Sequence, residues 1–253
     1  TDKQIEEIKE HLESAKNPLF YYDNDADGLC SFLLLARYLG RGKGVAVRSY
    51  PGLDKGYARR AEELGADYVF VLDKPVLSED FILEIERLGL PFVWIDHHDV
   101  GRKDYSKIHS NFFVYNPCKN EKKDKSSEPV TYLSYKITNR KEDMWIAMMG
   151  CIADHYLPDF ANDFSKKYKD YWGEVEKPFD AYYGTEIGKI AVALNFGLKD
   201  SITHVVQLQN FLISCKGPEE VFSDFLTNKS FRERYSEVKK KYQELLEKAK
   251  ASV

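Results

Sequence analysis

The chain has 253 residues, of which 43% are hydrophobic, and a net charge of −4 at pH 7. This length and composition suit one large domain, or one domain with an appendage, and the negative charge excludes a global basic surface, so any contact with nucleic acid needs a local basic patch. No stretch approaches the ~20 apolar residues of a membrane span and no signal peptide opens the chain, so we expect a cytoplasmic protein with no membrane partner.

The first half of the sequence alternates short apolar runs with helix-like segments. Its expected elements are helix 2–16, strand 19–23, helix 28–39, strand 45–49, helix 54–64, strand 68–72, helix 79–88 and strand 92–95. Short strands that alternate with helices of about ten residues predict βαβ units. The sequence therefore predicts the α/β fold class, with a parallel sheet and flanking helices.

The second half of the sequence is expected to be mainly helical. A short strand is expected at 112–115 and a charged loop at 119–125, and helical patterning dominates from residue 129 onward. The segment 144–153 predicts a helix that leads into Asp154, and 230–249 predicts a polar, charge-rich helix.

The four cysteines, at positions 30, 118, 151 and 215, are widely scattered and show no CxxC spacing. This spacing argues against a zinc site built from thiolates, so we expect reduced and mostly buried thiols.

Three of the four predicted strands in the first half end on an acid, namely Asp23, Asp73 and Asp96. A single such acid could merely cap the following helix. Three of them would meet at one edge, because the carboxyl ends of parallel strands lie together where open α/β sheets bind ligands.

Two dense polar clusters follow these strands, DNDADG at 23–28 and DHHD at 96–99. Two unit charges ~4 Å apart repel by roughly 4 kcal/mol at an effective dielectric constant near 20, and a divalent cation is the usual relief. Mixed carboxylate and imidazole ligands suit Mn²⁺ better than an all-oxygen magnesium site would. The clusters therefore predict a metal site.

Four motifs in order, DNDADG, Asp73 at the end of the third strand, Asp96-His97-His98 and Ala153-Asp154, resemble those of the DHH phosphoesterase superfamily, in particular its RecJ-like nucleases. The resemblance covers residues ~17 to 156. It implies a DHH phosphoesterase domain over residues 1–215 and a helical extension over 216–253. The extension resembles the linker to a DHHA1 domain, whose glycine-rich motif this sequence lacks.

The resemblance assigns site residues by position. It implies two Mn²⁺ ions, with Mg²⁺ as the alternative, held by Asp25, Asp27, Asp73, His97 and Asp154, with Asp23 as an outer or substitute ligand. Asp73 would bridge the two ions. It implies that His98 lies near the metal or the scissile phosphate, supported by Asp96.

Two positions depart from the family pattern. Many members carry a histidine where this chain has Tyr21, so Asp23 could compensate at the first metal. A small residue usually follows the bridging aspartate, whereas this chain has Lys74, which could contact a substrate phosphate or pair with the local acid cluster. Arg102 and Lys103, just after the triplet, are further candidates for binding substrate phosphates.

The expected function is a two-metal-dependent phosphoesterase, a RecJ-like nuclease that hydrolyses single-stranded or short DNA or RNA. Two alternatives stay open. One is a non-catalytic DHH-fold scaffold in a replication complex, and the other is a hydrolase of a small nucleotide or polyphosphate. A protein partner from the replication or repair machinery is expected to help hold the substrate.

Overall fold

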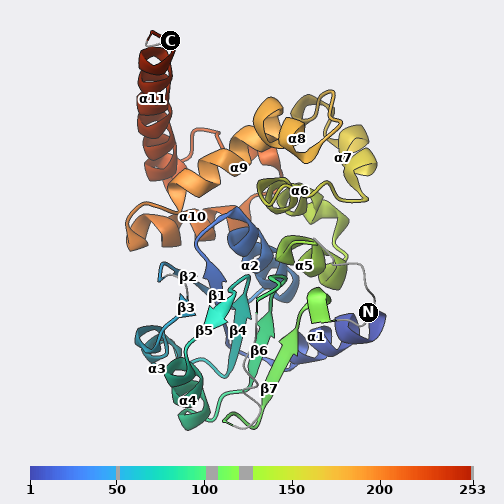
Figure 1. The fold of residues 1–253 in the computed structure, drawn as a ribbon, viewed down its shortest axis with the longest axis vertical. Coiled ribbons are helices and arrows are strands. Elements are labelled where there is room, and N and C mark those ends of the chain that lie inside the picture. Colours follow the sequence, from blue (N-terminus) through green and yellow to red (C-terminus); the bar gives the residue numbers. More distant parts are fainter. Residues whose placement is uncertain (50–51, 101–107, 120–127, 252–253) are drawn as a thin grey trace.

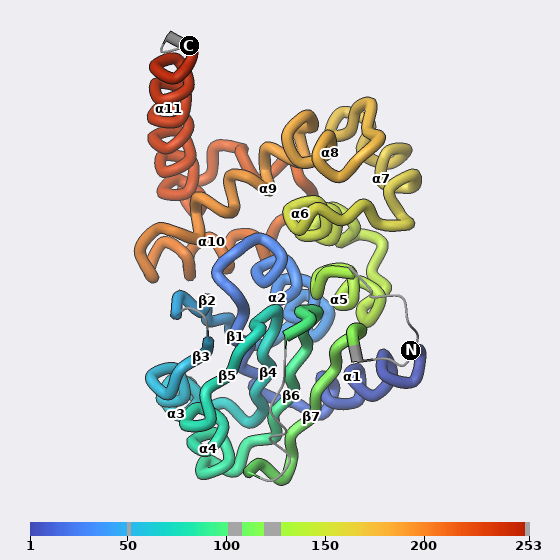
Figure 2. Tube along the Cα trace, in the orientation of Figure 1, coloured from blue at the N-terminus to red at the C-terminus, as the bar shows by residue number. Residues whose placement is uncertain are grey.

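The computed structural model describes residues 1–49, 52–100, 108–119 and 128–251. Within them the chain forms a parallel sheet with helices on both faces, followed by a mainly helical part (Figure 1, Figure 2). This arrangement confirms the predicted α/β class. Arg102 and Lys103 lie outside the described residues, so their predicted contact with substrate stays a prediction.

Five parallel strands form the central sheet. They are β1 (Pro18–Asp23), β2 (Lys43–Val47), β4 (Tyr68–Leu72), β6 (Phe92–Ile95) and β7 (Phe112–Tyr115). Their order in the sheet is β2-β1-β4-β6-β7, and every neighbouring pair is parallel. The central strands β1 and β4 are nearly continuous apolar runs because both of their faces are covered. This order places the carboxyl ends of β1, β4 and β6 side by side.

Helices cover the two faces of the sheet and form a core on each. They are α1 (Asp2–Ser14), α2 (Ala26–Leu39) and α5 (Val130–Thr138) on one face, and α3 (Arg59–Glu63) and α4 (Glu79–Arg87) on the other. Successive residues of a strand point to opposite faces. In β1, Phe20 and Tyr22 therefore enter the first core and Tyr21 enters the second.

The predicted helix over 54–64 is wrong in its first part. A 3-10 turn at Lys55–Tyr57 precedes the shorter helix α3. The carboxylate of Asp54 accepts a hydrogen bond from the backbone N–H of Gly56 at 2.8 Å, and this local bond favours a tight turn over a helix.

Two further strands were not expected from the sequence. β3 (Gly52–Leu53) and β5 (Val76–Leu77) pair as a two-stranded parallel sheet, and two residues are too few to show an alternating pattern. The strand expected over 45–49 begins and ends two residues earlier, as β2.

The helical part follows the sheet in the chain. Its helices are α6 (Met144–Ala153), α7 (Ala161–Lys167), α8 (Pro178–Gly184), α9 (Glu186–Gly197), α10 (Ile202–Ser214) and α11 (Lys229–Ala251). The predicted helix at 144–153 is confirmed, and the one at 230–249 lies within α11. Helix α6 is apolar on all sides and buried, as expected for such a helix. No helix among the described residues has the length and apolarity needed to cross a membrane.

Helices α6 to α10 lie above the sheet in Figure 1, and α11 projects from the body. Phe231, near the start of α11, is buried in the same core as α2, whereas residues 239–250 are exposed. The division of the chain at residue 215 stays a prediction.

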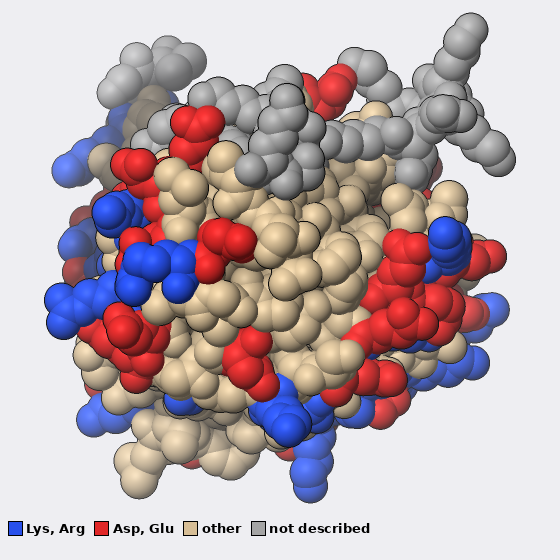
Figure 3. Space-filling model, turned by 90° about the horizontal axis from the view of Figure 1, so that it is seen from below, with Lys and Arg blue, Asp and Glu red and all other residues tan. Residues whose placement is uncertain are grey.

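Charged side chains on the lower end of the molecule are mixed in sign. Figure 3 shows Lys and Arg interspersed with Asp and Glu around an uncharged centre. The described part of this face therefore offers no continuous basic surface to a polyanion.

A buried ion pair joins the sheet-covering helix α2 to the helical part. Arg37 of α2 contacts Asp143, which directly precedes α6, through its Nη2 at 2.7 Å and its Nε at 2.9 Å. The Nη1 of Arg37 also donates to the backbone carbonyls of Ile213 and Cys215, both at 2.7 Å, at the end of α10. Asp143 is fully buried and accepts a further bond from Arg140 at 2.8 Å.

We expect Asp143→Ala to destabilise the protein by roughly 3–5 kcal/mol, because it leaves the guanidinium of Arg37 buried without its carboxylate. Urea unfolding followed by circular dichroism measures the change. Glu142→Ala is the matched control, since Glu142 makes an exposed pair with Arg140 and should cost less than about 1 kcal/mol. Equal losses in the two variants would contradict this account.

Candidate metal centre

Four segments bring predicted site residues together above the carboxyl edge of the sheet. Asp73 follows the end of β4 and Asp96 follows the end of β6, while Asp25 and Asp27 follow β1 at the start of α2. Asp154 joins them from the end of α6. The convergence follows from the strand order, because β1, β4 and β6 are neighbours.

The loop after β1 holds its two aspartates in different ways. Asp25 is the N-cap of α2, and its Oδ1 accepts the backbone N–H of Gly28 at 2.9 Å. Asp27 is buried and its two oxygens accept the backbone N–H groups of Val130 and Thr131, at 3.0 and 2.8 Å, at the start of α5. Gly28 is needed in this turn, because a Cβ there would lie 2.4 Å from the backbone oxygen of Asp23.

Asp73 carries a buried carboxylate in an unusual backbone conformation. Its φ is 58°, a region that non-glycine residues rarely adopt and that often marks functional sites. Its Oδ1 has no hydrogen-bond partner among the described residues, although it is buried. The Nε2 of His97 lies 3.4 Å from this oxygen, and the Nδ1 of His98 lies 3.9 Å from it.

The two histidines differ in their environment. Asp96 is fully buried, and its Oδ1 accepts the Nδ1–H of His98 at 2.7 Å while its Oδ2 accepts the amide of Asn116 at 3.2 Å. The hydrogen bond to Asp96 raises the pKa of His98, the largest of several causes. Burial lowers the pKa of His97, which favours the neutral imidazole that binds metals. The Nε2 of His97 also lies 3.8 Å from Asp154 Oδ2.

Two groups of ligand atoms in the described residues could each hold a metal ion. One comprises Asp73, His97 and His98, the other comprises Asp27, His97 and Asp154, and the atoms of each group lie within 4.8 Å of one another. The groups share His97, and both mix carboxylate oxygen with imidazole nitrogen. The unpartnered oxygen of Asp73 and this donor chemistry fit a divalent transition-metal ion such as Mn²⁺.

Crowding and burial raise the pKa of every acid in these groups. The pKa of Asp154 is raised to about 7, chiefly by burial and then by Asp27 and Asp25. Burial and then Asp27 raise the pKa of Asp25 to about 6. The pKa of Asp73 is raised well above its usual value by burial and by the neighbouring carboxylates. Without a cation, the cluster would therefore hold protons at a higher pH than isolated carboxylates do.

Asp23 and Lys74 pair with each other at the edge of the cluster. The Nζ of Lys74 lies 2.8 Å from Asp23 Oδ1, and the lysine side chain is 2% exposed. Of the two alternatives left open by the sequence, the structure shows Lys74 paired with the acid cluster. Asp23 belongs to neither ligand group above.

Tyr21 offers no ligand to this cluster. Its ring is buried in the core on the α3 and α4 face, and its hydroxyl donates to the backbone oxygen of Tyr57 at 2.8 Å. The position at which many family members carry a histidine therefore serves packing in this chain.

Residues in α9 and just after it hold the loop after β1, and sequence analysis missed them. Asn195 Oδ1 accepts the N–H of Ala26 at 2.9 Å, and its amide donates to the hydroxyl of Tyr182 at 3.0 Å. Lys199 donates to the backbone oxygen of Asn24, and its charge partly opposes the rise in the pKa of Asp25 that burial and Asp27 cause. Because these contacts join residues about 170 positions apart in the sequence, no local motif predicts them.

The profile of the DHH family, N-terminal domain, matches residues 19–157, which is more than half of the chain. The protein therefore belongs to the DHH family. No curated protein matches the chain in sequence.

Two solved structures share the fold over 97% of this chain. One is the exonuclease RecJ bound to manganese, with a TM-score of 0.59, 16% identity and 68% of that chain covered. The other is the DHH domain of a member of a family of ribosomal proteins, with a TM-score of 0.65, 13% identity and 61% of that chain covered. CDC45 from Entamoeba histolytica gives a TM-score of only 0.43 at 16% identity, over 60% of this chain and 32% of its own. At these identities the likenesses show the fold alone.

We expect Asp73→Asn to raise the Tm of the metal-free protein by about 2–4 °C, the shift that 1 kcal/mol produces in a domain of this size. Where folding raises the pKa of an acid, the folded protein loses stability as the pH rises through that pKa. The amide of the substituted asparagine does not ionise, so the variant avoids this loss. Asparagine also tolerates a positive φ, which alanine does not. Thermal melts in EDTA at pH 7.5 measure the effect.

Asp163→Asn is the control, since Asp163 lies on the exposed face of α7. A lower Tm for Asp73→Asn than for the wild type would show that the charge of Asp73 is compensated in the metal-free protein, against this account.

Proposed function

We propose that this protein is a manganese-dependent phosphodiesterase, a RecJ-like nuclease that hydrolyses single-stranded or short DNA or RNA. The observation that carries the proposal is the ligand group of Asp27, His97 and Asp154, beside the unpartnered oxygen of Asp73, which lies 3.4 Å from the Nε2 of His97. The family and the fold of the RecJ exonuclease support it.

Five side chains would hold two Mn²⁺ ions, or Mg²⁺ as the alternative: Asp25, Asp27, Asp73, His97 and Asp154. Asp73 would lie between the ions, because its carboxylate is the one with an unpartnered buried oxygen. Such a pair of ions activates water and stabilises the leaving oxygen of a phosphodiester when bound.

His98 is the candidate for proton transfer and phosphate binding. Asp96 holds the proton on Nδ1 and fixes the ring, which leaves Nε2 for the substrate. The raised pKa of His98 keeps a proton available near neutral pH for the departing oxygen. Asp96 is thereby a positioning residue.

Substrate phosphates need local cations, because the chain has a net charge of −4. Lys199 is exposed beside the loop after β1 and is suited to this role. Lys74 is held by Asp23 beneath the site, so its proposed contact with a phosphate would require that pair to open. Further binding of the substrate would come from Arg102, Lys103 and a protein partner from the replication or repair machinery.

A second candidate is hydrolysis of a small nucleotide or polyphosphate. The net charge of −4 favours it, since a short substrate needs no continuous basic surface. The non-catalytic scaffold would not need a ligand set this complete, so we prefer catalysis.

We expect Mn²⁺-dependent cleavage of 5′-labelled DNA or RNA 20-mers and dinucleotides, with none in EDTA. Asp73→Asn should lower kcat by at least about 10³-fold, and His98→Ala by about 10²–10⁴-fold, the usual contribution of general acid–base catalysis. His204→Ala is the matched histidine control on α10 and should leave kcat unchanged.

The products decide between the candidates. Cleavage of dinucleotides or nucleotides alone would favour the second one. Unchanged activity in EDTA or in Asp73→Asn would contradict both, and absence of Mn²⁺ binding would favour the scaffold.

The Mn²⁺ affinity should rise as the pH increases from 6 to 8. The pKa values of Asp25 and Asp154, about 6 and about 7, require these ligands to lose protons before they bind metal. Calorimetric titrations at pH 6 and pH 8, in buffers of different ionisation enthalpy, should show tighter binding at pH 8 and proton release at pH 6. An affinity that does not change with pH would contradict this ligand assignment.

A further inference from the structure

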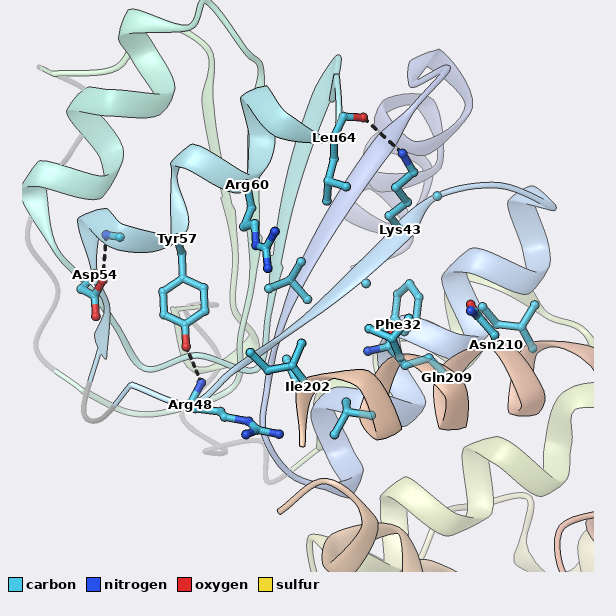
Figure 4. Close-up of a pocket in the computed structure, with 18 residues that line it drawn as sticks. Phe32, Lys43, Arg48, Asp54, Tyr57, Arg60, Leu64, Ile202, Gln209 and Asn210 are labelled. Carbon is cyan, nitrogen blue, oxygen red and sulfur yellow. Dashed lines mark hydrogen bonds between the residues drawn. The ribbon is translucent and has the colours of Figure 1, made fainter. Parts of the chain in front are cut away.

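A cavity of about 630 Å³ lies at the β2 edge of the sheet (Figure 4), and none of the candidate metal ligands lines it. Strand β2 runs along it. One wall comes from α10 and carries Ile202 and Val206, and the other comes from the segment with Tyr57 and Leu64. The two walls therefore belong to opposite faces of the sheet.

The cavity faces the backbone edge of β2. This strand is the last in the sheet order and pairs with β1 on one side only. Gly44 and Val45 both line the cavity although successive residues point to opposite faces, which requires a cavity at the edge. In a parallel strand, alternate residues direct their N–H and C=O groups to the two sides.

These outward groups are available for pairing. Among the described residues, the backbone of 43–47 makes no recorded hydrogen bond outside the pairing with β1. An edge strand with unpaired backbone groups is a template for a further strand.

The walls combine exposed apolar side chains with uncompensated positive charge. Ile202 is 62% exposed and Val206 is 42% exposed. Lys43 and Arg48 stand at the two ends of β2, and both donate to backbone carbonyls, Lys43 to Leu64 at 3.3 Å, with no carboxylate partner among the described residues.

The remaining charges of the cavity do not cancel this excess. Arg60 lines it as a third cation, although it pairs with Glu63 at 2.8 Å. Asp54 is the acid among the described lining residues. A ligand with negative charge is therefore favoured.

The chemistry distinguishes three occupants. A second copy paired through its own β2 would bring Lys43 and Arg48 of both copies together, which charge repulsion disfavours. A nucleic-acid strand would need several exposed aromatic faces for stacking, but Phe32 is 1% exposed, which leaves Tyr57 as the one partly exposed aromatic ring among the described lining residues. An extended peptide with acidic side chains satisfies the edge, the apolar wall and the charge.

We propose that this cavity binds an extended segment of a partner protein, which adds to β2 as a sixth strand. Its apolar side chains pack on Ile202 and Val206, and its Asp or Glu side chains pair with Lys43 and Arg48. The proposal stands independently of the reaction at the metal centre.

A phage-displayed library of random 12-residue peptides, selected on the whole chain, tests the proposal. We expect enriched peptides to alternate apolar residues with Asp or Glu. Lys43→Glu and Val206→Asp should each weaken binding of the synthesised peptides at least about 10-fold. Leu83→Asp is the control, since Leu83 is an exposed apolar residue on α4 that does not line the cavity.

Backbone pairing has its own readout. Two versions of the peptide are methylated at alternate backbone amides, one at the odd and one at the even positions. Only one version should lose binding, because only alternate amides of an added strand face β2. Bound peptide should also slow hydrogen exchange at residues 43–48. Thermal melts establish that the variants are folded.

Several results would overturn the proposal. These are failure to enrich any peptide, enrichment of basic or uncharged peptides, and binding that both cavity variants leave unchanged. Protection of 43–48 by an oligo(dT) probe, or by self-association at higher protein concentration, would assign the edge to another occupant.

Discussion

The structure depends on one constraint, the burial of several carboxylates at the carboxyl ends of adjacent parallel strands. The strand order β1-β4-β6 brings Asp73 and Asp96 beside the loop that carries Asp25 and Asp27. Each carboxylate raises the pKa of its neighbours, and burial adds to the effect. The fold alone therefore assembles a cluster that is stable only with protons or with a cation, and this property links the sheet topology to the proposed chemistry.

Specific hydrogen bonds from the surrounding structure hold most of these buried carboxylates in place. Backbone N–H groups at the start of α5 donate hydrogen bonds to Asp27. The side chains of Asn116 and His98 donate to Asp96, and Lys74 pairs with Asp23. These acids are fixed in place, whereas Asp73 keeps an unpartnered oxygen. The helical part contributes as well, since Asn195 of α9 holds the loop after β1 and the buried pair of Arg37 and Asp143 joins that part to α2. The helices beyond the family match are thus part of the site's support.

The sequence predicts the local features well because they depend on near neighbours. The ends of β1, β4 and β6 follow from apolar runs that stop at an acid, and the motifs around Asp25 and His97 are short. It could not reveal that Tyr21 turns into the opposite core, that Lys74 pairs with Asp23, or that Asn195 reaches Ala26, because each of these depends on packing between distant segments. The sequence did not predict the strands β3 and β5 for a different reason, since a strand of two residues shows no alternating pattern.

The most direct test of the central claim is a crystal structure with Mn²⁺, with anomalous scattering recorded at the manganese edge. The account predicts two anomalous peaks about 3.5–4 Å apart, the usual spacing of a two-metal site, with Asp73 between them and His97 as a ligand. Peaks elsewhere on the protein, or none within reach of Asp73, would contradict it.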